Sequence, residues 1–113
     1  MDYIITNKPK MVRIAEEKPK QYTFNLLQNY PNPFNSTTQI KFEIPESSLV
    51  SLTIYDLLGK EVVLLLNEEK RQGAYTVNWG GKDNYGRELG SGVYFYQLKV
   101  GSFYEVRKLI FLK

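Results

Sequence analysis

The chain has 113 residues and contains no histidine, no cysteine and only two methionines. Without cysteine it has no disulfide framework, no thiolate nucleophile and no zinc–thiolate site. Without histidine it lacks the usual general base of catalysis near neutral pH, and its serines have no partner for a catalytic triad. We therefore predict that the protein is not an enzyme and that it uses no cofactor.

Long apolar segments and strong charge are also missing. The sequence has no stretch of about 18 apolar residues, and its first residues include no apolar segment typical of a secretory signal peptide. The net charge is only +3, and the basic residues form no stripe that would neutralise a phosphate backbone. We predict no membrane insertion and no nucleic-acid partner. If the protein is exported, we expect this sequence to be part of a longer chain.

What the sequence does have is aromatic residues, nine Tyr and six Phe, and a pattern with a period of two. Aromatic and β-branched side chains fit the pleated surface of a strand. Thr38, Ile40, Phe42 and Ile44 share one face of a predicted strand, and similar alternation recurs in residues 50–54, 75–79 and 93–100. About six or seven short strands with frequent turn signals predict an all-β fold, an antiparallel β-sandwich.

Several segments have a definite expected place in this sandwich. Gly59 is expected at a positive-φ position in a hairpin turn, and residues 101–102 form a two-residue turn. Residues 61–66 are apolar on both faces, so we expect them to be covered on both faces or to lie between neighbours. Residues 67–73 are expected to form a charged loop, and residues 80–92 a long irregular segment.

The closing strand, residues 103–112, offers two alternating rows of side chains. We expect Tyr104, Val106, Ile110 and Leu112 to point inward, with Lys108 interrupting this row.

Charge and proline dominate the N-terminal part of the chain. We predict a polar linker over residues 1–25, with a weak edge strand near residues 12–15. The sandwich domain is then expected to span residues 26–113, and residues 22–26 could begin its first strand.

Residues 30–35, which we call the clasp, read Tyr-Pro-Asn-Pro-Phe-Asn and precede the first strong strand pattern. The two prolines fix φ and remove backbone donors, so the clasp is not a regular paired strand. We expect Tyr30 and Phe34 to anchor in the end of the sandwich, and Asn32 and Asn35 to bond their own backbone. Two interpretations stay open: a rigid lead-in to the next strand, or a surface that grips another protein.

Asp83, Asn84 and Glu88 carry oxygen atoms of the kind that calcium binds. Their spacing does not follow the alternating pattern of a calcium loop, whereas Asp-Asn-x-Gly is typical of a tight turn. We predict a turn here and no metal site.

Residues 107–113 form a strand pattern that begins with two basic residues. This segment is either a closing strand with solvated charges or a terminal signal that another protein recognises.

Taken together, the motifs occur in a characteristic order. They are the clasp, the strand patterns at 38–45 and 50–62, Gly73-x-Tyr75-x-Val77-x-Trp79, the Ser-Gly-Val-Tyr-Phe-Tyr of residues 91–96, and Arg107-Lys108-Leu109. In this combination residues 24–113 resemble the type A C-terminal sorting domain of the bacterial type IX secretion system. Ser36 and Gly80 depart from the family pattern, which often has Pro and Asp or Asn there.

The resemblance implies an Ig-like sandwich, similar to that of flagellar hook-capping proteins, at the end of a larger protein of a Gram-negative bacterium. That protein would pass through the periplasm and be secreted or held at the cell surface. Outer-membrane secretion machinery would recognise the domain, and a sortase-like protease would cleave it from the fused N-terminal cargo before Gln28. The implied recognition residues are Tyr30, Pro31, Asn32, Pro33, Phe34, Asn35, Ser91, Gly92, Val93, Tyr94, Arg107, Lys108, Leu109 and Lys113.

Two other functions stay open. An adhesion or carbohydrate-binding module would stack sugars on exposed aromatic rings, with Tyr22, Tyr85 and Trp79 as candidates, although we expect Trp79 in the core. A plain structural spacer would remain attached to the mature cargo. The apolar residues 62–66 and the free sheet edges further indicate a possible homodimer formed through sheet edges.

Overall fold

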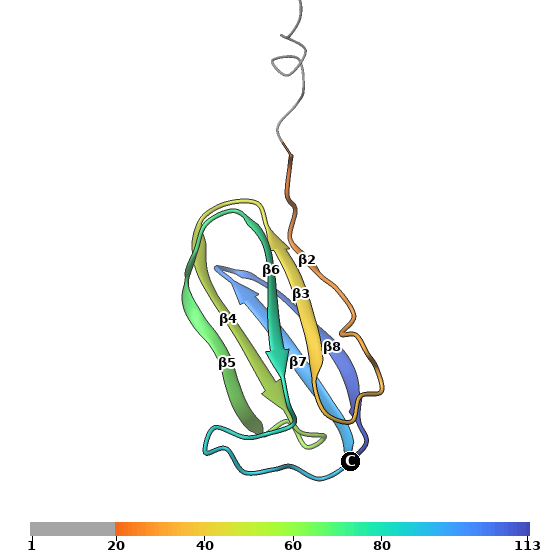
Figure 1. Cartoon of the computed structure of the whole chain (residues 1–113). Helices are drawn as coiled ribbons and strands as arrows, with labels where there is room; N and C mark the ends of the chain where they lie inside the picture. The colour runs from red at the N-terminus through yellow and green to blue at the C-terminus, as the bar shows by residue number, and fades with distance from the viewer. Residues whose placement is uncertain (1–19) are drawn as a thin grey trace, which may run out of the picture.

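The computed structural model describes residues 20–113 and shows a sandwich of two antiparallel sheets (Figure 1). One sheet has the order β2-β3-β6 and consists of β2 (Asn25–Leu26), β3 (Thr38–Ile44) and β6 (Gly73–Trp79). The other has the order β5-β4-β7-β8 and consists of β4 (Ser48–Tyr55), β5 (Glu61–Lys70), β7 (Gly92–Val100) and β8 (Phe103–Phe111). The predicted antiparallel β-sandwich is confirmed.

Part of the predicted linker, and the weak strand predicted near residues 12–15, lie outside the described residues. Within residues 20–113 no helix is long and apolar enough to cross a membrane. The alternating residues 22–26 yield only the two-residue strand β2, which pairs Asn25 with Glu43 and Leu26 with Phe42.

The strand order is that of an immunoglobulin sandwich with one strand exchanged. In a constant-type immunoglobulin domain, strands ABED face strands CFG. Counted from β2, the strand β5 is the fourth and so corresponds to strand D. It pairs with β4 rather than with β6, so a sheet of three strands faces a sheet of four. As a consequence β6 is an edge strand, with β3 as its hydrogen-bonded neighbour.

Side chains that alternate along both sheets fill the space between them. The inward row predicted for β3 is buried, and its outward residues are exposed or half-buried. The inward row of β7 is buried as well, because this strand lies in the interior of its sheet. The buried apolar cluster consists of Leu26, Phe34, Ile40, Phe42, Ile44, Val50, Leu52, Ile54, Val63, Trp79, Tyr94, Tyr96, Leu98, Val100, Leu109 and Phe111.

The prediction for residues 61–73 is wrong in two respects. β5 continues to Lys70, so most of the expected charged loop is strand. Among the apolar residues of β5 only Val63 is buried, and Leu64 is 41% exposed, because β5 is an edge strand. The ladder with β4 has two register shifts, and such bulges break the regular alternation of side chains between the two faces of the strand.

The inward face of β8 is the opposite of the predicted one. The expected turn at 101–102 is present and pairs Val100 with Phe103. Paired residues of an antiparallel ladder share a face, and Val100 is buried, so the odd-numbered residues of β8 point inward. Leu109 and Phe111 are therefore core residues. Of the four residues predicted to point inward, Tyr104, Val106 and Leu112 are exposed and Ile110 is half-buried.

Two turn predictions are confirmed. Gly59 has a φ of 85° in the β4–β5 turn, where Asp56 Oδ1 accepts hydrogen bonds from the N–H groups of Leu58 and Lys60. Residues 80–91 form the expected irregular segment between β6 and β7.

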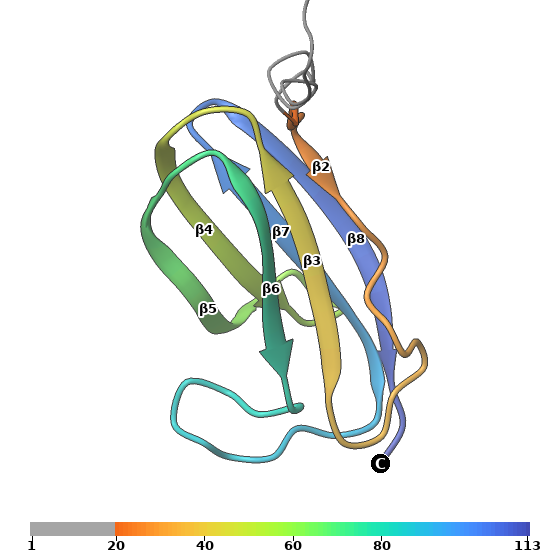
Figure 2. The ribbon, with the colours of Figure 1, turned by 45° about the horizontal axis from the view of Figure 1, so that its top comes forward.

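The two long sides of the sandwich differ. On one side the segment between β2 and β3 runs beside β8 and joins the two sheets (Figures 1 and 2). There Arg107 Nε donates a hydrogen bond to Leu26 O at 2.6 Å, and the Tyr96 hydroxyl donates to Leu27 O at 2.7 Å. On the other side β5 and β6 are the edge strands of their sheets and do not pair with each other. The first side is closed and the second is open.

Candidate functional site

The clasp is hydrogen-bonded to the end of β8. Phe34 N–H donates to Ile110 O at 3.1 Å, and Leu112 N–H donates to Phe34 O at 2.9 Å, which forms a parallel bridge between Phe34 and Phe111. Asn32 Oδ1 accepts a further bond from Ile110 N–H at 2.9 Å. The clasp therefore covers the outer edge of the last strand.

Four aromatic rings pack beneath this contact. The ring centroid of Phe34 lies 4.9 Å from that of Phe111 and 5.6 Å from that of Trp79. The ring centroids of Tyr94 and Trp79 are 5.7 Å apart. Gly81 has a φ of 74°, and a Cβ at this position would lie 2.6 Å from the Phe111 ring. The rings come from the clasp, β6, β7 and β8, so the clasp closes this end of the core.

Two details of the clasp differ from the prediction. Phe34 is 2% exposed and is the expected anchor, whereas Tyr30 is 80% exposed and is not. The backbone of Tyr30 pairs with Gln39, and its ring extends into solvent. Asn32 bonds β8 rather than its own backbone. The peptide bonds before both prolines of the clasp are cis.

The start of β7 pairs with one edge of the end of β8 and the clasp with the other, so the structure brings the three predicted recognition segments to the same end of the sandwich, with β8 in the middle. Gly92 is paired with Phe111 in the β7–β8 ladder. Ser91 Oγ accepts a hydrogen bond from Lys113 N–H at 2.8 Å. Lys113 Nζ lies 3.3 Å from a carboxylate oxygen of Glu88.

Some of the predicted residues are unable to touch a partner at this end. Tyr94 and Leu109 are buried in the core. Arg107 Nε is bonded to Leu26 O, so this side chain is directed to the segment before the clasp. The backbone carbonyl of Lys108 accepts a hydrogen bond from Gln28 Nε2 at 2.8 Å, whereas Lys108 itself is exposed.

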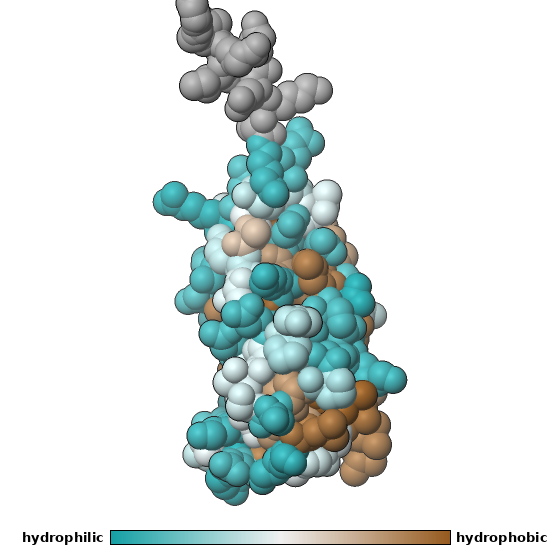
Figure 3. All heavy atoms as spheres, turned by 45° about the vertical axis from the view of Figure 1, so that its right-hand side comes forward, coloured by the Kyte–Doolittle hydropathy of each residue, from teal (hydrophilic) through white to brown (hydrophobic). Residues whose placement is uncertain are grey.

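A hollow of about 450 Å³ lies between the clasp and the last residues. Its lining residues are Pro31, Pro33, Phe34, Asn35, Leu112 and Lys113. Leu112 is 51% exposed, and Figure 3 shows hydrophobic side chains gathered toward the lower end of this face of the molecule. We call Tyr30, Pro31, Pro33, Leu112 and Lys113 the clasp surface.

Sequence reasoning missed a buried polar network behind the clasp. Asn29 is 2% exposed, and its Nδ2 donates to Thr38 Oγ1 at 2.9 Å and to Pro31 O at 3.2 Å. Thr38 Oγ1 in turn donates to Pro31 O at 2.8 Å. Buried polar groups are usually paired in this way. The network fixes the Pro31 carbonyl and so orients the clasp.

The same network reaches the centre of the sandwich through Tyr96. Its hydroxyl accepts a hydrogen bond from Asn29 N–H at 2.8 Å and donates to Leu27 O. Burial raises the pKa of Tyr96 to about 12. The one signal in the sequence was Thr38, a polar residue at the end of an otherwise apolar inward row.

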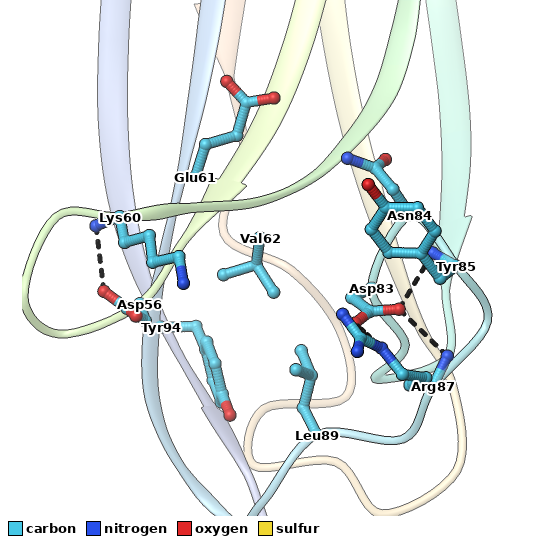
Figure 4. Close-up of a pocket in the computed structure, with 10 residues that line it drawn as sticks. All are labelled: Asp56, Lys60, Glu61, Val62, Asp83, Asn84, Tyr85, Arg87, Leu89 and Tyr94. Atoms are coloured by element: carbon cyan, nitrogen blue, oxygen red, sulfur yellow. Dashed lines mark hydrogen bonds and ion pairs between the residues drawn. The ribbon is translucent and has the colours of Figure 1, made fainter.

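A second hollow, of about 500 Å³, lies between the β4–β5 turn and the irregular segment (Figure 4). Asp83, one of its lining residues, accepts hydrogen bonds from the N–H groups of Tyr85 and Arg87 and from Arg87 Nε. Desolvation acts to raise the pKa of Asp83, but these hydrogen bonds together hold it below its usual value. The predicted turn is confirmed, and residues 20–113 contain no cluster of metal-ligating side chains.

The three aromatic residues considered for sugar stacking do not form a row. Trp79 is 3% exposed, in the core. Tyr85 is exposed in the irregular segment, where Arg87 lies over its ring. Tyr22 precedes β2 and stacks with Lys20.

The model of one protein family, described as the secretion system C-terminal sorting domain, matches residues 28–112. This match covers most of the chain, and the chain belongs to that family. The resemblance drawn from the sequence motifs is confirmed. No curated protein matches the chain.

Two solved structures from Porphyromonas gingivalis share the fold. Dimeric latent PorU has a TM-score of 0.66 and 19% identity, and the match covers 83% of this chain and 10% of that one. PorZ, a surface component of the type-IX secretion system, has a TM-score of 0.52 and 19% identity, and the match covers 76% of this chain and 11% of that one. The chain thus spans about a tenth of the length of each protein.

Proposed function

We propose that this chain is the C-terminal sorting signal of a larger protein, which it directs across the outer membrane of a Gram-negative bacterium by type IX secretion. It acts without catalysis, through recognition by the outer-membrane machinery. Membership of the sorting-domain family supports this role. The observation that carries it is the pairing of the clasp with the end of β8, because it unites two distant motifs in one surface.

We assign recognition to the clasp surface. Its side chains are accessible and mostly apolar, and Lys113 adds a cation at the margin. The backbone beneath is held by prolines and by the buried polar network, so binding would cost little conformational entropy. Phe34, Tyr94 and Leu109 support this surface from the core without touching the partner.

We also propose that a sortase-like protease separates the domain from its cargo within the linker, residues 1–25. Leu27 N–H donates to Lys41 O, and the carbonyls of Leu26 and Leu27 accept bonds from Arg107 and Tyr96. A protease would have to break these hydrogen bonds to cleave a peptide bond after residue 25. Peptide bonds earlier in the linker can be cleaved without disturbing the sandwich.

The test is to fuse the whole chain to the C-terminus of a reporter that carries a signal peptide. The fusion is expressed in a bacterium with active type IX secretion and in an isogenic strain that lacks it. We expect the reporter outside the cell, without the sandwich domain by mass spectrometry, only in the first strain. A reporter that stays in the periplasm of both strains contradicts the sorting role. A secreted reporter that keeps the domain contradicts cleavage and favours the spacer function.

A further inference from the structure

The backbone of β6 presents hydrogen-bonding groups to the open side of the sandwich. Gln39 exchanges both of its backbone hydrogen bonds with Tyr30, on the side away from β6. Gln39 is opposite Asn78, so the backbone groups of Asn78 face the open side, and by alternation those of Ala74 and Thr76 do too. Within the described part of the chain, no backbone hydrogen bond reaches these outward groups.

This edge also lacks the features that usually protect edge strands. Natural edges carry charges, prolines or bulges that prevent further pairing. β6 has no charged residue and no proline, and its register with β3 is regular. β5 is the contrasting case, with two register shifts, charged residues near its end, and Leu64 N–H bonded to Asn84 Oδ1 at 3.0 Å.

Apolar interior is accessible beside the β6 edge. Tyr75 and Val77 point toward the core but are only half-buried, and so are Leu65 and Leu66 on the facing strand β5. A strand added to β6 would cover part of this apolar surface and remove it from water.

We propose that the β6 edge pairs with the same edge of a second copy of the chain, antiparallel and with Thr76 on the two-fold axis. This places Thr76 opposite Thr76, Ala74 opposite Asn78, and Tyr75 opposite Val77. Threonine pairs and aromatic–β-branched pairs are favourable across strands. Because β6 has no charged residue, two copies of it can pair without placing like charges opposite each other. The sequence indicated a possible homodimer through sheet edges, on the basis of residues 62–66 and the free edges, and the edge proposed here is that of β6. The pairing needs no secretion machinery and stands independently of the sorting role.

The first test measures the mass of the whole chain by sedimentation over a concentration series. We expect a monomer–dimer equilibrium. Thr76→Lys and Thr76→Glu each place like charges opposite each other and should weaken dimerisation about tenfold. An equimolar mixture of the two variants should restore it, which a folding defect would not do. If the chain is monomeric at every concentration, the proposal is overturned. The β6 edge would then be available to pair with a strand of another protein.

The second test uses the absence of native cysteine. Directly opposed residues of a hydrogen-bonded pair have Cα atoms about 5.5 Å apart, within disulfide range. Thr76→Cys should therefore form a cross-linked dimer under mild oxidation. Leu64→Cys, at an exposed position of β5, is the matched control and should remain reduced. Cross-linking at residue 64 as fast as at residue 76 would overturn the assignment to β6.

Discussion

The rings of Phe34 and Phe111 stack with their centroids 4.9 Å apart, and the backbone of Phe34 bonds both Ile110 and Leu112. Phe34 belongs to the clasp and Phe111 to the last strand, so segments from the two ends of the domain form one unit. Both rings are buried, whereas the clasp surface above them is exposed. The clasp surface therefore exists only when the sandwich is folded.

The first prediction separates the two aromatic residues of the clasp. Phe34→Ala removes a buried ring and should lower the free energy of unfolding by about 3–5 kcal/mol. Tyr30→Ala, at an exposed position, should change it by less than about 0.5 kcal/mol. Denaturant unfolding of both variants is the measurement. Similar losses for the two would show that Phe34 is not the anchor.

The second prediction concerns the space beneath the Phe111 ring. Gly81 and Gly86 have nearly the same positive φ, 74° and 79°, but only at Gly81 would a Cβ meet another residue. Alanine at either position should cost about 1–2 kcal/mol from backbone strain. Gly81→Ala should cost about 1–3 kcal/mol more through overpacking against the ring. Equal unfolding free energies for the two variants would contradict this contact.

The third prediction is a pH dependence of stability. Burial raises the pKa of Tyr96 to about 12, above its reference value of 10.0. The folded state therefore holds this proton more tightly, and the resulting stability is present below pH 10 and lost as the pH rises toward 12. Tyr96→Phe should cost about 1–3 kcal/mol at neutral pH, because Asn29 N–H and Leu27 O lose their partner.

The readout for Tyr96 is the difference between the wild type and Tyr96→Phe across the alkaline range, since the other tyrosines titrate in both proteins. The difference in unfolding free energy should shrink as the pH rises from about 10 to 12. A difference that stays constant over this range would mean that the hydroxyl of Tyr96 is not the group responsible.

The sequence predicted correctly the strands that lie inside a sheet, or that turn one regular row of apolar side chains toward the core. The period-two pattern of β3 and β7 was read correctly because each has a single apolar face against the other sheet. For β5 the prediction was that apolar residues on both faces would be covered on both faces or lie between neighbours. It was wrong because β5 is an edge strand with bulges, and neither property leaves a mark in the hydrophobic pattern.

The inward face of β8 was read wrongly because its inward row contains Glu105 and Arg107. These charges are tolerated there since β8 is at the sheet edge, where Arg107 finds a carbonyl acceptor on Leu26 and Glu105 as an ion partner. The two-residue turn alone would have given the correct face. Asn29 was missed because its role depends on Thr38 and Tyr96, which only the fold brings close to it.

The most direct test of the central claim is the secreted fraction of a reporter fused to this chain. One double variant, Tyr30→Ala with Leu112→Ser, alters the clasp surface, and a matched one, Tyr104→Ala with Leu49→Ser, alters exposed residues elsewhere. As a control for stability, both double variants must first be shown to unfold at the same denaturant concentration as the wild type. We predict that the clasp variant lowers secretion at least about tenfold, with periplasmic accumulation, and that the control is secreted normally. Normal secretion of the clasp variant, or an equal loss in the control, would contradict the account.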